Sequence, residues 1–237
     1  MNPYHPQEFF DLSNSPAAFE LFKDITYVWE GVAALPTFIE RILEPKILGE
    51  VEEGAWVEPG KVQMEPGSRV ERGAVVRGPT IIGRNTVVRS KAYIRGHVML
   101  GENCTIGHGV EIRQILVLNN SQIAHTNIVT TSLIGNRVQV AYLAGCLNCR
   151  LDGKPIRVKI DRGEEKQEFP TELFHLGACV GDDSKMGAMA ILQPGTVVGQ
   201  RCVIYPQCSV GGYVPNDSIV KLTSQPVEVI PRNQSQK

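Results

Sequence analysis

The sequence lacks several features that would mark a membrane or nucleic-acid-binding protein. No apolar run reaches about 18 residues, the length needed for a transmembrane helix. The 237 residues carry a net charge of −1, so the basic footprint of nucleic-acid binding is missing. The N-terminus lacks the basic-then-apolar profile of a signal peptide. These absences predict a soluble, cytoplasmic protein that binds neither nucleic acid nor membrane.

Cysteine is present, but its spacing does not indicate a disulfide framework. The six cysteines are scattered, and three of them, Cys104, Cys202 and Cys208, fall on inward positions of the repeat described next. Cys146 and Cys149 have the spacing of half a zinc site, but no second pair has ligand spacing. The sequence therefore predicts core or loop cysteines and no metal site.

A six-residue repeat organises most of the chain. Apolar residues stand six positions apart at Val70, Val76, Ile82, Val88, Ile94, Leu100, Ile106 and Ile112. A small or β-branched residue follows most of them four positions later. No helix has this period, whereas a short strand and a tight turn do. Because side chains alternate across a strand, both residue types point inward. The pattern predicts a parallel β-helix of hexapeptide repeats.

The same period returns from Val180 to Val210. Three hexads make one turn, so we expect one mainly β domain over residues 47–223 with about eight or nine turns. Residues 150–175 break the repeat with a charged run. We predict an inserted loop there, either on a binding face or as a solvated excursion without a role.

The ends of the chain do not share the repeat. Ser15 and Pro16 have the chemistry of a helix start. Apolar residues follow at helical spacing, with a break near Thr26 and with Pro36 ending one helix and opening another. We expect two or three short helices in residues 1–46 that cap the open N-terminal end of the solenoid. The alternative is a partner-docking arm anchored by Trp29. Residues 224–237 are assigned to a C-terminal tail.

One irregularity stands in the middle of the solenoid. The step from Ile123 to Ile134 is eleven residues instead of twelve, which suggests that one hexad has lost a residue near Ile128. His125 would lie in this deviant hexad. A departure from a regular scaffold is a place where function is expected.

Residues 91–222 resemble the acetyltransferase domain of the bifunctional sugar-1-phosphate nucleotidyltransferase/acetyltransferases. The matching pieces are Tyr93 to Arg95, Gly107 to Arg113, Ser121 to His125, Leu147 to Asp152, Lys154, Arg157 and Ile204 to Pro206. The resemblance implies left-handed winding and a homotrimer with active sites between subunits. Nothing in residues 1–46 matches the family's Gly-rich nucleotide loop, so no pyrophosphorylase activity is expected.

The resemblance also implies roles for particular residues. His125 would take a proton from the amine of a hexosamine 1-phosphate, which then attacks the thioester of acetyl-CoA, the co-substrate. An imidazole that titrates near neutrality suits this step. Asn148 would position the amine or the thioester. The sugar phosphate would be held by Arg95, Glu111, Arg113, Lys154 and Arg157, and CoA by Gly187, Ala188 and Pro206. Arginine and lysine are the expected partners of a phosphate monoester.

The predicted function is therefore acetyl-CoA-dependent N-acetyl transfer to glucosamine 1-phosphate or galactosamine 1-phosphate. One departure weighs on this reading, because Ile128 stands where the family has a tyrosine that contacts the substrate. Two other classes stay open. One is an inactive β-helix that binds a nucleotide sugar or serves as a scaffold. The other is a metalloenzyme of the γ-carbonic anhydrase type, although no two of the five histidines have that family's five-residue ligand spacing.

Overall fold

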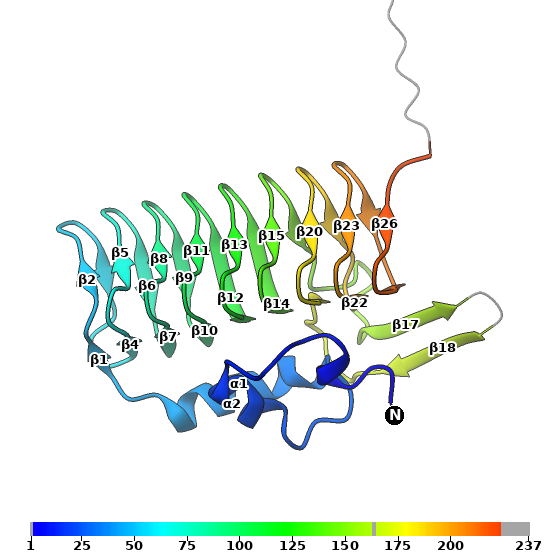
Figure 1. Cartoon of the computed structure of the whole chain (residues 1–237), viewed down its shortest axis with the longest axis horizontal. Helices are drawn as coiled ribbons and strands as arrows, with labels where there is room; N and C mark the ends of the chain where they lie inside the picture. Colours follow the sequence, from blue (N-terminus) through cyan, green and yellow to red (C-terminus); the bar gives the residue numbers. More distant parts are fainter. Residues whose placement is uncertain (1, 163–164, 224–237) are drawn as a thin grey trace, which may run out of the picture.

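The computed structural model is a parallel β-helix with a layer of helices along one side (Figure 1). It describes residues 2–162 and 165–223. Inward residues of successive turns, such as Ile82, Leu100 and Ile106, are buried in one continuous core along the axis. Cys104, Cys202 and Cys208 belong to the same core, as predicted. The solenoid predicted from the hexad pattern is thus confirmed. The assigned C-terminal tail, residues 224–237, lies outside the described residues.

One face of the coil is a sheet of nine parallel strands, one from each turn, and is called the nine-stranded face. Its strands are β2 (Glu50–Val51), β5 (Arg69–Val70), β8 (Val87–Val88), β11 (Thr105–Ile106), β13 (Gln122–Ile123), β15 (Gln139–Val140), β20 (Lys185–Met186), β23 (Val203–Ile204) and β26 (Ile219–Val220). Nine turns agree with the number expected from the repeat.

The other two faces form a single fifteen-stranded sheet, because β12 (Glu111–Val117) and β14 (Ile128–Ile134) run around the corner between them. The helix-covered face holds the second halves of these strands with β1 (Lys46–Ile47), β4 (Val62–Met64), β7 (Thr80–Ile82), β10 (Val98–Leu100), β19 (Ala178–Val180), β22 (Thr196–Val198) and β25 (Tyr213–Val214). The third face holds their first halves with β3 (Trp56–Val57), β6 (Val75–Arg77), β9 (Tyr93–Arg95), β16 (Gly145–Cys146), β21 (Ile191–Leu192) and β24 (Ser209–Val210).

The shortened turns lie at the corner between the third and the helix-covered faces. Ile82 pairs with Leu100, which follows it by eighteen residues in the chain. Leu100 pairs with Val117, which follows it by only seventeen residues. The shortened corners hold Gln114 and Thr131, both with positive φ, 46° and 47°. A strand that continues around the corner needs one residue fewer there than a separate turn does.

The expected loss of a residue near Ile128 was therefore placed wrongly. Ile123 pairs with Ile106 and Val129 pairs with Ile112, so the six-residue step between these inward positions is unchanged. The hexad of His125 is regular. The argument that singled out His125 because its hexad is deviant does not hold, and its candidacy rests on its surroundings.

The N-terminal segment forms η1 (Pro6–Glu8), α1 (Pro16–Phe22) and α2 (Glu30–Ile42). Helix α1 begins at Pro16 with Ser15 at the N-cap position, and the chain breaks between the helices, as predicted. Pro36, however, lies inside α2 rather than between two helices. Burial of Val32, Leu35 and Ile39 along one side of α2 keeps the helix continuous through the proline.

These helices lie along the flank of the solenoid instead of capping its end (Figure 1). Helix α2 contacts β10, β12 and β14. Beneath the layer, outward side chains of the helix-covered face, Met99, Leu116 and Leu133, are buried with the helices in a second apolar cluster. The prediction of an end cap was wrong because these strands are apolar on both sides, so the flank itself needs a cover.

The same cluster accounts for Trp29 and for the insertion. Trp29 is buried and stacks on Tyr27 with ring centroids 4.9 Å apart, so it anchors this layer and not a docking arm. The insertion forms an antiparallel hairpin of β17 (Arg157–Arg162) and β18 (Glu165–Pro170). Val158 is buried in the cluster, and the ring centroids of Phe169 and Trp29 lie 5.3 Å apart. Strands β17 and β18 of the insertion are thus part of the flanking layer. Within the described ranges, no helix has the length and apolar character needed to cross a bilayer.

Candidate functional site

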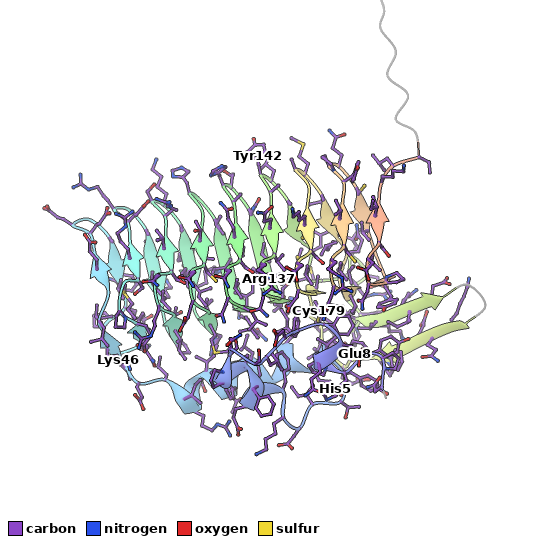
Figure 2. All side chains as sticks on the ribbon, viewed as in Figure 1. His5, Glu8, Lys46, Arg137, Tyr142 and Cys179 are labelled. Atoms are coloured by element: carbon purple, nitrogen blue, oxygen red, sulfur yellow. The ribbon has the colours of Figure 1, made fainter. Side chains whose placement is uncertain are left out.

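His125 lies on the ridge where the nine-stranded face meets the third face. It is exposed, in the turn between β13 and β14. Each turn of the coil is one rung of the solenoid. The strand register places His108 one rung before His125 on this ridge, and Tyr142 one rung after it. The amide of Thr126 donates to the carbonyl of His108 at 2.9 Å, which locks the neighbouring rungs together. Figure 2 shows Tyr142 projecting outward from the ridge.

The third face, next to this ridge, brings three of the predicted phosphate-site residues together. Arg95, Glu111 and Arg113 stand at outward positions of adjacent rungs, and Arg95 forms an ion pair with Glu111. Glu111 pairs in register with Ile128, three residues after His125. Arg95, then Glu111 and Arg113, and then the turn of His125 thus belong to three consecutive rungs of this face. Where the family has a tyrosine, the side chain of Ile128 is 60% exposed.

Asn148 lies at the opposite edge of the third face, where the insertion begins. Its carbonyl accepts a hydrogen bond from the amide of Leu176 at 2.9 Å, which closes the insertion. Two residues on, Arg150 donates to both carboxylate oxygens of Asp152 at 2.8 and 2.6 Å. These hydrogen bonds lower the pKa of Asp152 well below its usual range. The motif from Asn148 to Asp152 thus forms a turn held by a bidentate ion pair.

Lys154 and Arg157 lie at the root of the hairpin. Both line a small cavity of about 190 Å³ that also includes Arg150 and Glu172. Arg157 is paired with Glu168 at 3.3 Å, and it also lines a larger cavity of about 870 Å³ between the hairpin and the late rungs. Within the described ranges, Lys154 makes no ion pair. The two cations thus line one hollow.

The residues predicted to bind CoA continue along the ridge. Ala188 lies two rungs beyond His125 and Pro206 three rungs beyond it. Gly187 and Pro206 line a shallow hollow of about 240 Å³ on the nine-stranded face. A Cβ on Gly187 would come within 2.6 Å of the Pro206 nitrogen, so the close packing of these rungs requires glycine.

The structure therefore divides the predicted residues into two groups. Arg95, Glu111, Arg113 and the turn of His125 belong to three consecutive rungs of the third face, while Asn148, one rung later, opens the insertion at the end of that face where Arg95 and Arg113 stand. Among the described residues, no hydrogen bond or ion pair joins the two groups. No described cluster of three or more His, Cys, Asp or Glu side chains could hold a metal ion. Cys146 is buried, which raises the pKa of its thiol to about 12, and Cys149 is exposed.

The sequence analysis did not identify several polar groups around these sites. The Ser90 hydroxyl lies 3.0 Å from Nδ1 of His108 on the ridge, and Lys159 and Tyr213 line the 870 Å³ cavity. Arg77 extends the row of Arg95 and Arg113 by one rung. Arg77 occupies an outward position of the repeat and could have been found by reading positions eighteen residues apart beside the inward ones, whereas Lys159 lies in the hairpin, where the repeat gives no signal.

Comparisons with known proteins agree with the repeat and with the resemblance. Residues 76–161 match the family model described as the GMPPB C-terminal domain. The chain is 30% identical over 199 residues to the bifunctional protein GlmU of Methanococcus vannielii, covering 84% of this chain and 46% of that protein. It is 27% identical over 183 residues to a bifunctional sugar-1-phosphate nucleotidylyltransferase/acetyltransferase of Sulfurisphaera tokodaii, covering 77% of this chain and 44% of that protein.

Among solved structures, the chain is similar to a UDP-N-acetylglucosamine acyltransferase from Campylobacter jejuni. The TM-score is 0.37 and the identity 15%, over 73% of this chain and 69% of that one. The chain spans about half the length of the bifunctional relatives that it matches.

The fold is a parallel β-helix of hexapeptide repeats, and the sequence is similar to those of bifunctional GlmU proteins. The chain resembles the acetyltransferase domain of the bifunctional sugar-1-phosphate nucleotidyltransferase/acetyltransferases.

Proposed function

We propose that the protein transfers the acetyl group of acetyl-CoA to the amine of an amino-sugar phosphate of the glucosamine or galactosamine 1-phosphate type. The observation that carries this proposal is the register of the third face. Arg95 and Arg113 stand one above the other on the third face, and the turn of His125 leads into the next rung of the same face. The anion-binding side chains and the exposed imidazole therefore belong to consecutive rungs of one face.

The chemistry assigned to His125 follows from its exposure and its place on the ridge. The neutral imidazole accepts a proton from the substrate ammonium, and the free amine attacks the carbonyl carbon of the thioester. A C–N bond forms and the C–S bond breaks; the imidazolium gives its proton to the departing CoA thiolate, and the nitrogen releases its second proton to solvent. Arg95 and Arg113 hold the phosphate, with Glu111 fixing the guanidinium of Arg95.

The remaining predicted residues complete the site from its other edges. Gly187, Ala188 and Pro206 continue the ridge away from His125 and would receive CoA along the close-packed rungs. Asn148, Lys154 and Arg157 stand across the third face. In a homotrimer these residues of one subunit would meet His125 of a neighbour, which is why we propose a shared site. We propose the cytoplasm as the location of this reaction.

The test is to incubate the protein with acetyl-CoA and a panel of amino sugars and their 1-phosphates, and to follow release of the CoA thiol. Because Cys149 is exposed, each assay needs a blank without the acceptor to correct for its reaction with a thiol reagent. We expect release only with a phosphorylated amino sugar. No release with any acceptor would contradict the proposal.

The second candidate is a β-helix that binds a sugar nucleotide without catalysis. The observation in its favour is Ile128, an exposed apolar side chain where the family has a tyrosine hydroxyl. Saturable binding of the acceptor panel without CoA release would select this candidate.

A further inference from the structure

The turn that opens the insertion carries an ion pair to which the proposed function gives no role. Arg150 and Asp152 lie between Asn148 and Lys154 in the chain. Nε and Nη2 of Arg150 donate to the two carboxylate oxygens of Asp152 at 2.8 and 2.6 Å, and both side chains are partly exposed. Because an exposed ion pair adds little to the free energy of folding, stability does not account for this geometry.

The carboxylate of Asp152 orients two cationic residues at once. Besides the guanidinium of Arg150, its Oδ1 accepts a hydrogen bond from the backbone amide of Lys154 at 3.3 Å. The intervening Gly153 has a φ of 66°, a conformation that glycine adopts readily and that turns the chain back at this point. Asp152 therefore fixes the Arg150 side chain and the backbone of Lys154 relative to each other.

Arg150 retains hydrogen-bond donors for a ligand. A guanidinium group has five N–H donors, of which Asp152 accepts two. Among the described residues, the Arg150 guanidinium forms no other hydrogen bond or ion pair. A guanidinium held rigidly, with donors to spare, suits the oxygens of a phosphate group.

The position of Arg150 brings it together with the two cations already assigned to the substrate. Arg150, Lys154 and Arg157 line the same cavity of about 190 Å³, several times the roughly 30 Å³ that one water molecule occupies. Arg150 and Arg157 also line the cavity of about 870 Å³, whose size is typical of a small-molecule site. Arg157 is held less firmly, by a single hydrogen bond to Glu168 at 3.3 Å. Arg150 is therefore the cation whose geometry is fixed in advance.

We infer that Arg150 binds the phosphate of the acceptor beside Lys154 and Arg157, and that Asp152 is the residue that positions it. The inference rests on the proposed function for the identity of the acceptor, a sugar 1-phosphate. Asp152 favours anion binding although it carries a negative charge, because the long side chain of Arg150 is already ordered before the phosphate arrives. Glu172 lines the same cavity without an ion pair in the described part of the chain, so its carboxylate only repels the anion.

Phosphate binding can be measured without an acyl donor, by isothermal titration of the full chain with glucosamine 1-phosphate and galactosamine 1-phosphate. Arg150→Gln should raise the dissociation constant of the sugar phosphate about tenfold or more, the value of one charged hydrogen bond. Arg150→Lys keeps the charge but cannot form the bidentate pair, and its dissociation constant should lie between the two. Arg84→Gln removes the same charge from an exposed corner, 4.0 Å from Glu102, and should bind as the wild type does.

The sign of the effect at Asp152 separates positioning from charge. Asp152→Asn removes a negative charge near the anion, so charge alone would tighten the binding of the sugar phosphate. Positioning predicts the opposite, a dissociation constant about three- to tenfold higher, which is the cost of ordering one long side chain on binding. In turnover the same variant should raise KM for the sugar phosphate and leave kcat and the KM for acetyl-CoA unchanged. Glu172→Gln removes a carboxylate from the same cavity and should not weaken binding.

The inference is overturned if neither sugar phosphate binds, if Arg150→Gln binds it as the wild type does, or if Asp152→Asn binds it equally or more tightly. Equal melting temperatures of the variants and the wild type would show that these changes do not act through folding. Failure of the proposed function has a different signature, which is binding of the sugar phosphate that depends on Arg150 without CoA release from any acceptor. Acetylation of the sugar phosphate with an unchanged KM in Arg150→Gln would uphold the proposed function and remove this inference.

Discussion

The side-chain amide of Gln114 donates a hydrogen bond to the backbone carbonyl of Val32 at 3.0 Å. Within an unbroken α-helix, that carbonyl would accept from the amide of residue 36, but residue 36 is a proline and has no N–H. Gln114 occupies the shortened corner of β12, where φ is 46°. The irregular turn of the solenoid thus supplies the donor that the irregular helix lacks.

Gln114→Ala should therefore lower the free energy of unfolding by about 1–3 kcal/mol, the cost of an unpaired buried carbonyl. Urea denaturation measures it. Gln122→Ala, at an exposed position of the nine-stranded face, is the matched control and should stay within about 0.5 kcal/mol. In a Pro36→Ala background the helix regains its own donor, so the cost of Gln114→Ala should fall. An equal cost in both backgrounds would show that the hydrogen bond is not what matters.

The neighbouring carboxylates Asp182 and Asp183 should change stability with pH in opposite directions. Burial raises the pKa of Asp182, whereas hydrogen bonds from Arg137 lower the pKa of Asp183, each from 3.8. The Asp183 contribution is present above 3.8 and is lost as the pH falls through its folded pKa. The Asp182 contribution is full below 3.8 and is lost as the pH rises through its folded pKa.

Accordingly, Asp183→Asn should destabilise the protein more at about pH 7 than at about pH 3, and Asp182→Asn should do the reverse. Urea denaturation of both variants and the wild type at the two pH values checks this. The same sign of pH dependence in both variants would contradict the assignment.

His125→Ala should lower kcat by about 10²-fold or more, because a positioned general base typically contributes 10²–10⁴. Acetyl-CoA binding, measured by titration, should survive. His108 stands one rung earlier on the same ridge, hydrogen-bonded to Ser90, and His108→Ala is the matched control with near-normal turnover. Normal turnover of the His125 variant would assign it a structural role.

Lys154→Ala and Arg157→Ala should each raise KM for the sugar phosphate roughly tenfold to a hundredfold, since charged hydrogen bonds contribute about 1.5–3 kcal/mol. Neither change should affect the poor reaction of the unphosphorylated sugar. Lys166→Ala, which removes a cation paired with Asp161 further out on the hairpin, should leave KM unchanged. Unaltered KM in both root variants would place the phosphate elsewhere.

We expect light scattering to give three times the chain mass of 26.1 kDa. The helix-covered face is already occupied, whereas the third face exposes Ile128 and Leu147, at 60% and 48%. The substitution Leu147→Asp should dissociate the trimer, because it places a charge in an apolar contact. Ile219→Asp, on the nine-stranded face, serves as control. A monomer at micromolar concentration would contradict both the trimer and the shared site.

The β-helix could be predicted from the sequence because the pattern that produces it is local. Every sixth residue must be buried and the fourth after it must be small, so Val70 to Ile112 show the period without any knowledge of the rest of the chain. Helix α1 was equally legible from Ser15 and Pro16. The assignments of His125, Asn148 and the cations came from resemblance and remain proposals.

Contacts between segments distant in the chain decided the rest. An amphipathic helix is satisfied by any apolar surface, and only the outward Met99, Leu116 and Leu133 place α2 on the flank. Likewise, Pro36 breaks a helix unless its missing donor is compensated, and the compensating Gln114 is 82 residues from Val32. The arginine row is also tertiary, because residues eighteen apart become neighbours only when the coil closes and parallel strands align their outward side chains.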